Sequence, residues 1–311
     1  MRRVVVIGAG FFGSVIARRL ADVAITPVVA SRTHGEMRLD VEDGASIRGA
    51  LRKGDVIVDT AGPFQTRSAA LAEAVIELGC DLIDLSDSLA YARAVLALHD
   101  RAVAAGVRIF SSCSAIATVA ASAIRASGSV APETCDLFLA PASADTGNPA
   151  TVSAFLASVD WSRSREFPAD RRRGYRVESA AAVMLPRSWP SLRWVDFWVD
   201  PNAPFAANAV RLATRLGLAS LVAAVAPVSA RILGRRQGSF SVATSEGGRY
   251  SLTRLSAPRG SYLIAAEPAV LAAESLTRGS ETAAGVVPAG AQVDPGTLFA
   301  RLRALGVDVR S

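Results

Sequence analysis

The sequence contains very little lysine and histidine, and this narrows the enzyme chemistry that it can support. Lys53 is the single lysine, and no tyrosine stands four residues before it. The Tyr-x-x-x-Lys catalysis of short-chain dehydrogenases and Schiff-base catalysis are therefore both disfavoured. The two histidines, His34 and His99, lie in the first third of the chain. Their position argues against an enzyme that uses a histidine of a second domain as its acid or base.

Cysteines and long apolar runs are also scarce. The three cysteines have no C-x-x-C spacing, so we predict neither a disulfide framework nor a metal site; they are Cys80, Cys113 and Cys135. The most apolar run, residues 216–226, is shorter than a membrane span and is flanked by arginines, so we expect no stable membrane insertion. The first strand is predicted directly after Met1, which leaves no room for a signal peptide, and we expect a cytoplasmic protein.

Arginine makes up nearly all of the 34 basic residues, and the formal net charge is +6. The arginines are scattered except at 171–173, so the positive charge is weak evidence for nucleic acid and fits an anionic cofactor or substrate equally well. We predict no nucleic-acid partner. The run at 171–173 is expected in a solvated loop, with binding of a substrate carboxylate or phosphate as the alternative.

A glycine pattern near the N-terminus indicates a dinucleotide site. Residues 3–13 read RVVVIGAGFFG, and residues 12–21 have helical character. A strand, a G-x-G-x-x-G turn and a helix in this order form the cradle for a dinucleotide pyrophosphate. Gly8 permits the tight turn, Gly10 lets the phosphates approach the backbone, and Gly13 lets the helix pack close to the strand. Together with Phe11 and Phe12 they are predicted to bind the cofactor; the alternative is an ordinary turn that binds nothing.

The remaining pattern divides the chain into two parts. Up to about residue 120, strands alternate with helices, as expected for a doubly wound parallel sheet of the Rossmann type in an α/β protein. After about residue 128, short strands predominate, and we predict an α+β domain with a mostly antiparallel sheet. The predicted strands are 25–30, 55–60, 80–85, 107–111, 137–141, 151–159, 175–178, 181–185, 195–200, 239–244 and 250–256. The predicted helices are 68–78, 90–105, 206–216, 220–233, 267–277 and 297–305.

The residues after the second predicted strand bear on the choice of dinucleotide. Sites for NAD usually carry Asp or Glu there, whereas residues 30–33 read ASRT. Arg32 can form charge-assisted bonds to a 2′-phosphate, and Ser31 and Thr33 can donate to it. We therefore predict NADP(H) rather than NAD(H) as cofactor. The alternative is that Arg32 is a solvated turn residue.

Several stretches resemble the saccharopine dehydrogenase-like oxidoreductases: DVIVDTAGPF at 55–64, AEAVIELGCDLIDLSD at 72–87, and residues 266–307. The resemblance implies that the turn formed by Ala61, Gly62, Pro63 and Phe64 lies beside the nicotinamide. It also implies a Rossmann domain made of residues 1–120 and 265–311, around an inserted substrate-binding and dimerisation domain, 121–264. Residues 111–117 read SSCSAIA and lack the Asp and Pro of a loop found in some members, so the amino-acid-binding groups do not transfer.

Candidate catalytic residues follow from the rule that open α/β sheets bind ligands at the carboxyl ends of their strands. They are Asp84, Ser86, Asp87 and Cys113. Each has a structural alternative: Asp84 as an acceptor of backbone bonds, Ser86 and Asp87 as helix caps, and Cys113 as a buried thiol. Further hydroxyl donors, each with packing as the alternative role, are Tyr175, Tyr250 and Tyr262.

Together these observations predict an NADP(H)-dependent oxidoreductase that transfers a hydride to or from a C=N or C=O carbon of a small molecule. The lack of a strong general acid favours imine reduction, since an iminium arrives already protonated. One alternative is a protein that senses the NADP(H) ratio without catalysis. Another is a lipid or polyketide reductase, which would use the apolar run and Trp189, Trp194 and Trp198 as a pocket; these tryptophans fit the interface of an expected homodimer equally well.

Overall fold

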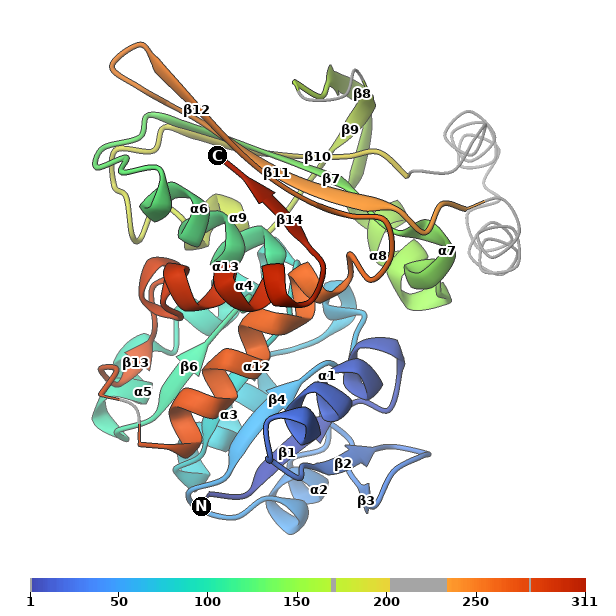
Figure 1. The fold of residues 1–311 in the computed structure, drawn as a ribbon. Coiled ribbons are helices and arrows are strands. Elements are labelled where there is room, and N and C mark those ends of the chain that lie inside the picture. The colour runs from blue at the N-terminus through green and yellow to red at the C-terminus, as the bar shows by residue number, and fades with distance from the viewer. Residues whose placement is uncertain (1, 169–171, 202–233, 280) are drawn as a thin grey trace.

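The computed structural model describes residues 2–168, 172–201, 234–279 and 281–311. Two sheets, each with its own helices, make up the described part of the chain (Figure 1). The parallel sheet and its helices occupy the lower half of that view, and the second sheet lies across the top. The predicted α/β class is confirmed: a parallel sheet of Rossmann type is joined to a second, mixed sheet.

The first sheet has the strand order β13-β6-β5-β4-β1-β2-β3, and its pairs are parallel. Without β13, this is the 3-2-1-4-5-6 order of a dinucleotide-binding Rossmann fold, with the switch between β1 and β4. The strands are β1 (Val4–Ile7), β2 (Val28–Ser31), β3 (Met37–Arg38), β4 (Val56–Asp59), β5 (Asp81–Asp84), β6 (Arg108–Phe110) and β13 (Gly285–Val286).

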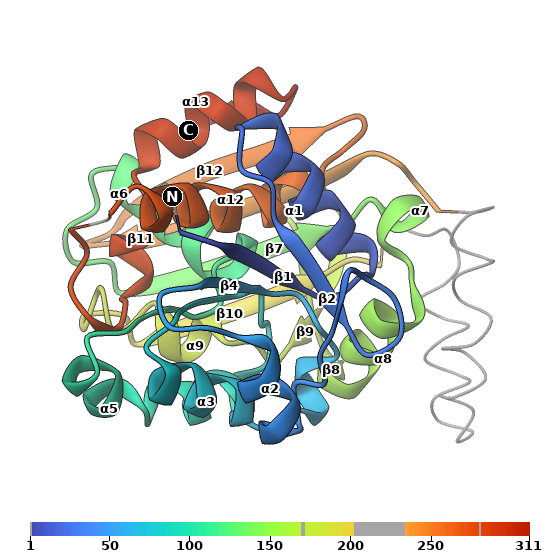
Figure 2. The same ribbon diagram turned by 90° about the horizontal axis from the view of Figure 1, so that it is seen from below.

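Helices cover both faces of the parallel sheet, which Figure 2 shows edge-on between two helical layers. Val4 and Val6 pack into one core with residues of α1 and α12, whereas Val5 and Ile7 pack into the other core with residues of α2, α3 and α4. This alternation explains why β1 is apolar at every position. The helices are α1 (Phe11–Asp22), α2 (Gly44–Ala50), η1 (Phe64–Thr66), α3 (Ala70–Leu78), α4 (Leu89–Leu96), α5 (His99–Ala104) and α12 (Leu263–Thr277).

The second sheet has the order β14-β12-β11-β7-β10-β9-β8, in which β7 and β10 are parallel and the other neighbours antiparallel. The predicted mostly antiparallel sheet is therefore confirmed. Its strands are β7 (Thr134–Ala140), β8 (Val159–Glu166), β9 (Arg173–Val177), β10 (Trp194–Val199), β11 (Gly238–Glu246), β12 (Arg249–Ala257) and β14 (Asp308–Arg310). Its helices are η2 (Ala115–Val119), α6 (Ala120–Ala126), α7 (Ser143–Thr146), α8 (Pro149–Ser158), α9 (Ala181–Met184), η3 (Ala289–Ala291) and α13 (Pro295–Ala304).

Two predicted strands are wrong, because both segments are helical. Residues 151–159 lie mainly in α8, where the Asn148 side chain accepts the Thr151 amide and Pro149 occupies the first turn. These are helix-start signals that outweigh the β-branched residues of the segment. Residues 181–185 form α9, a short helix whose alanines favour helical backbone.

Other boundaries are shifted rather than misassigned. The strand predicted at 25–30 begins only at Val28. The Ile25 amide is used at the end of α1, where it donates to the Leu20 carbonyl, and Pro27 has no amide hydrogen with which to pair in a sheet. The helix predicted at 90–105 is divided into α4 and α5. The helices predicted at 206–216 and 220–233, and the apolar run at 216–226, lie outside the described residues.

The C-terminal stretch serves both sheets. Ala269 and Val270 of α12 pack against the parallel sheet, and β13 extends that sheet. Leu298 and Leu302 of α13 belong to the core under the second sheet, and β14 pairs with β12. α12 and β13 therefore pack with the parallel sheet, whereas β14 completes the other sheet. The domain boundaries themselves stay a prediction.

Candidate functional site

The glycine turn has the geometry that its three glycines predict. Gly8 adopts φ +106°, a conformation that L side chains rarely adopt. A Cβ on Gly13 would lie 1.7 Å from the Gly8 carbonyl oxygen, so the close packing of α1 on this turn requires glycine there. A Cβ on Gly10 would meet nothing within 4 Å. The space above Gly10 is therefore open, as a site for an approaching phosphate must be.

The first turn of α1 is free to bind an anion. Gly10 is the N-cap of this helix, and no side chain caps the amides of its first turn. Helix N-termini carry unpaired N–H groups and the positive end of the helix dipole, which together attract phosphate. The ring of Phe11 packs edge-to-face on Tyr262, which immediately precedes α12, with centroids 5.0 Å apart. Tyr262, which the sequence offered as a hydroxyl donor or a packing residue, thus packs beside the glycine turn.

A second turn, Ala61 to Phe64, is joined to the glycine turn by Thr60. The Thr60 hydroxyl donates to the Ile7 carbonyl at 2.8 Å, and its oxygen would be 2.5 Å from a Cβ on Gly8. Gly62 and Pro63 are joined by a cis peptide bond. The two turns therefore lie side by side at the carboxyl ends of β1 and β4, the switch point where open α/β sheets bind ligands.

A buried ion pair holds the Ala61–Phe64 turn. Asp59 is fully buried; its Oδ1 accepts the Ala61 amide at 3.0 Å, and its Oδ2 accepts Nη1 of Arg67 at 2.7 Å. The same Arg67 nitrogen donates to the Ala61 carbonyl at 2.9 Å. Burial raises the pKa of Asp59, although Arg67 opposes the shift. Both polar groups of Ala61 are thus fixed by one carboxylate and one guanidinium.

Aromatic rings enclose this ion pair. The Arg67 guanidinium carbon lies 5.0 Å from the centre of the Phe64 ring and 5.6 Å from that of Tyr91, and these rings contact each other. Cation–π contact of this kind favours arginine over lysine. Sequence analysis missed Arg67. A signal was available, because an aspartate at the end of a buried strand needs a cation, and Arg67 is the next basic residue along the chain.

Three of the four candidate catalytic residues are fully buried. Asp84 Oδ1 accepts the amides of Ser86 at 3.0 Å and Ser112 at 2.8 Å, so the carboxyl group ties the ends of β5 and β6 together. Ser112 has φ +55°, which is strained for serine. Burial raises the pKa of Asp84 to about 6. Burial also raises the pKa of the Cys113 thiol to about 12, which keeps it protonated at neutral pH.

The fourth candidate, Asp87, is only half-buried. Its Oδ1 accepts Nε2 of Gln65 at 2.9 Å, and its carbonyl oxygen accepts the Ala180 amide, also at 2.9 Å. Gln65 follows Phe64 directly, and Ala180 precedes α9. Asp87 therefore lies where the end of the Ala61–Phe64 turn meets the segment that carries α9. Sequence analysis did not find Gln65.

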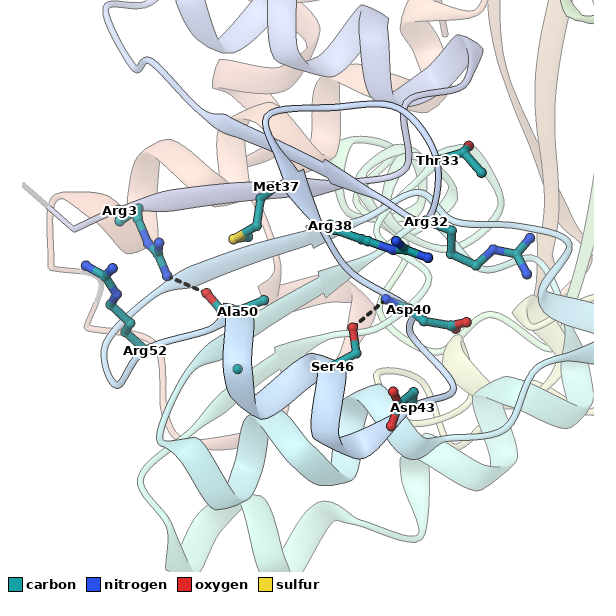
Figure 3. A pocket seen from close by; sticks show the side chains of 11 residues that line it. Arg3, Arg32, Thr33, Met37, Arg38, Asp40, Asp43, Ser46, Ala50 and Arg52 are labelled. Carbon is teal, nitrogen blue, oxygen red and sulfur yellow. Dashed lines mark hydrogen bonds between the residues drawn. The ribbon is translucent and has the colours of Figure 1, made fainter.

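A groove lies beside the end of β2, with a volume of about 770 Å³ (Figure 3). It is lined by Arg3, Arg32, Thr33, Met37, Arg38, Asp40, Asp43, Ser46, Gly49, Ala50 and Arg52. In Figure 3 the side chains of Arg32 and Arg38 extend to one end, and Arg3 and Arg52 lie at the opposite end. Arg3 is paired with Asp55, whereas Arg32 and Arg38 form no ion pair with any described residue.

Ser31 has a different role from the one predicted. Its hydroxyl oxygen accepts the His34 amide at 2.7 Å, and its hydroxyl donates to the His34 carbonyl. The side chain thus closes its own turn and is occupied before any ligand binds. Arg38, which the sequence did not indicate, is paired in register with Ser31 across the two strands. It adds a second arginine at the end of β2.

The other residues singled out from the sequence are dispersed. Trp189 and Trp198 are buried in separate cores, and Trp194 is 63% exposed, so the three do not line one pocket, which was one of the two alternatives considered for them. His99 accepts the Val286 amide at 3.1 Å and so joins α5 to β13. Arg171 lies outside the described residues.

Two general findings limit the kinds of site. The described residues contain no group of three His, Cys, Asp or Glu side chains placed to hold a metal ion. Among the helices that could be searched, none combines the length and the apolar character needed to cross a membrane.

The strand order and the paired turns at its switch point define the class: a Rossmann-type fold of the dinucleotide-binding kind, joined to a second sheet. Residues 4–110, about a third of the chain, match the family model of the saccharopine dehydrogenase NADP binding domain. A search of curated protein sequences found no match.

Three solved structures are similar to this chain at low sequence identity. Apo saccharopine dehydrogenase (L-Glu forming) from Saccharomyces cerevisiae is 12% identical, with a TM-score of 0.63 over 100% of this chain and 99% of the other. A DAP dehydrogenase from C. glutamicum, in complex with DAP, is 16% identical, with a TM-score of 0.47 over 97% and 98%. The WlbA dehydrogenase from Thermus thermophilus, in complex with NAD and α-ketoglutarate, is 12% identical, with a TM-score of 0.44 over 96% and 94%.

Proposed function

We propose that this chain is an NADP(H)-dependent oxidoreductase that transfers a hydride to or from a C=N or C=O carbon of a small-molecule substrate. The observation that carries the proposal is the junction of two turns at the sheet's switch point. One turn leaves open space over a helix N-terminus, and the other is held rigid by the Asp59–Arg67 pair. A rigid turn next to an open phosphate-binding site suits hydride transfer, a reaction that depends on how the nicotinamide and the substrate are positioned.

The residues present fit a dinucleotide. Gly10 and the first turn of α1 would hold the pyrophosphate, and residues 61–64 would line the nicotinamide end. When bound, the nicotinamide would supply or accept the hydride at C4. The chain's own part is to orient the ring against Pro63 and Phe64 and to exclude water. The buried Asp84 and Cys113 keep the strand ends in place behind that site.

Arg32, Thr33 and Arg38 support NADP(H) as the cofactor. They line one groove at the end of β2, where the ribose 2′-substituent of a Rossmann-bound dinucleotide lies. Two arginines without a carboxylate partner favour a 2′-phosphate, and residues 30–33 supply no acid for a ribose 2′-hydroxyl. Ser31 is not assigned a role toward the phosphate because its hydroxyl serves the turn.

The cofactor preference is tested by fluorescence titration with NADPH and NADH. We expect NADPH to bind more tightly, and Arg38→Gln and Arg32→Gln each to weaken NADPH binding by roughly tenfold while NADH binding stays unchanged. Arg52→Gln is the matched control, since Arg52 lines the opposite end of the same groove. Tighter binding of NADH, or an equal effect of all three substitutions, contradicts the preference.

Turnover is tested by NADPH oxidation with a panel of cyclic imines and ketones. Oxidation with at least one of these substrates supports the enzyme. Tight NADPH binding without turnover on any of them instead favours the alternative, a sensor of the NADP(H) ratio. The homodimer and the cytoplasmic location stay predictions, and light scattering coupled to size exclusion tests the first.

A further inference from the structure

Asp87 and Gln65 are hydrogen-bonded to each other beside the proposed nicotinamide site, and each has one further oxygen that can accept a hydrogen bond. Gln65 continues the turn that begins at Ala61, and Asp87 lies three residues beyond the end of β5. The Gln65 amide nitrogen donates to Asp87 Oδ1 at 2.9 Å. The Asp87 backbone is bound to Ala180, so the pair lies between the cofactor domain and the segment that leads into α9.

The charge of Asp87 has no counterpart within the described residues. Its side chain is bonded to a neutral amide, and no arginine, lysine or histidine of the described segments forms an ion pair with it. Arg67, two residues after Gln65, is committed to Asp59 and to the Ala61 carbonyl. A half-buried carboxylate without a cation is costly unless a ligand completes it.

Gln65 has an unused acceptor. Its Oε1 is buried and has no hydrogen-bond partner among the residues that the structure describes. Because Nε2 is bonded to Asp87, the amide group cannot turn without losing that bond. The pair thus has one negative charge, on the Asp87 carboxylate, and one unused acceptor, the Gln65 carbonyl oxygen, and neither side chain carries a positive charge. The complementary ligand is a positively charged nitrogen with at least two N–H groups.

We propose that Asp87 and Gln65 bind a cationic nitrogen of the substrate, either an ammonium group or a protonated imine whose nitrogen carries two hydrogens. The inference rests on the proposed function, because it is the bound dinucleotide that makes this junction a substrate site. An N–H group would donate to the free oxygen of Asp87 and a second to Gln65 Oε1. Charge-assisted bonds of this kind are about twice as strong as neutral ones. The site would therefore select amines and iminium ions over alcohols and ketones of the same shape.

Two probes with the same ring test this selection: cyclopentylammonium and cyclopentanol. Each is titrated by calorimetry, near neutral pH, into the full chain saturated with NADP⁺. We expect the ammonium to bind at least about tenfold more tightly than the alcohol. Asp87→Asn should abolish this preference, and Gln65→Met should weaken ammonium binding while part of the preference remains. Asp308→Asn, an exposed aspartate on β14, is the matched control and should change nothing.

The outcomes separate this inference from the proposed function. If NADP⁺ itself fails to bind, the proposed function fails. If NADP⁺ binds and the alcohol binds as tightly as the ammonium, or if Asp87→Asn retains the preference, the cation site is refuted and the proposed function stands. Should Asp87→Asn fail to fold, Gln65→Met decides: unchanged ammonium affinity in that variant refutes the site.

Discussion

Substituting Gly10 with alanine should separate cofactor binding from folding. Gly10 has φ −80° and ψ −164°, extended backbone that any residue adopts, and a Cβ there meets no atom within 4 Å. The methyl group would occupy the space through which a phosphate reaches the first amides of α1. The substitution therefore leaves the folded chain unstrained and obstructs only the ligand.

The expected magnitudes follow from this geometry. Replacing an unstrained glycine by alanine stabilises the folded state by about 0.4–1 kcal/mol, because alanine lowers the conformational entropy of the unfolded chain. At an N-cap position alanine is less favourable than glycine by a similar amount, which offsets that gain. The net change in the free energy of unfolding should stay within about 1 kcal/mol, which is a few degrees in Tm. Loss of one charge-assisted hydrogen bond to the pyrophosphate costs roughly 1.5–3 kcal/mol, or about 10- to 150-fold in the Kd for NADPH.

Thermal unfolding and NADPH fluorescence titration measure the two effects on the same sample. Gly13→Ala is the contrasting variant, because its Cβ would lie 1.7 Å from the Gly8 carbonyl oxygen, a backbone atom that cannot move aside cheaply. We expect Gly13→Ala to lower both Tm and affinity. If Gly10→Ala binds NADPH with an unchanged Kd, or loses as much Tm as Gly13→Ala, the assignment of the phosphate path over Gly10 is wrong.

Three further substitutions test the groups behind the site. Arg67→Met leaves Asp59 buried without its cation and should lower the free energy of unfolding by about 3–5 kcal/mol in a denaturant titration, with a smaller loss for Arg67→Lys; an unchanged midpoint would contradict the role of the pair. Burial raises the pKa of Asp84 to about 6, so the folded state holds a proton that the unfolded state releases, and stability rises as the pH falls through 6 toward 4. Asp84→Asn should therefore be more stable than the parent chain near pH 7.5, by at most about 3 kcal/mol, and this advantage should shrink by pH 5; a constant difference would refute the shift. Glu267→Gln removes the buried carboxylate that accepts from Arg301 and should cost about 1.5–3 kcal/mol, again by denaturant titration.

Much of the cofactor domain could be predicted because its signals are local. The order of strand, glycine turn and helix at Gly8 to Gly13 reflects steric limits on the backbone over a few residues. The continuous apolar strands likewise indicate a sheet buried on both faces. Strands were also predicted at 239–244 and 250–256, and the structure joins them as the hairpin of β11 and β12 through Gly247 and Gly248, which both adopt positive φ.

Prediction was less accurate where local signals competed. The segments that became α8 and α9 are short and apolar, and periodicity alone does not distinguish a strand from a helix over so few residues. In α8 the decisive signal was the Asn148 cap with Pro149 after it. The apolar content of the segment outweighed that signal in the sequence-based assignment.

The sequence by itself determined the cofactor class and the sheet that holds the cofactor, because both follow from glycine sterics and from hydrophobic patterns within one strand–turn–helix unit. Only the tertiary structure decided which side chains complete the site. Asp59 and Arg67, Gln65 and Asp87, and Ser31 and Arg38 are 7 to 22 residues apart in the chain and lie on different elements. Their contacts depend on how strands and turns are placed against one another, and no periodic pattern along the chain records that placement.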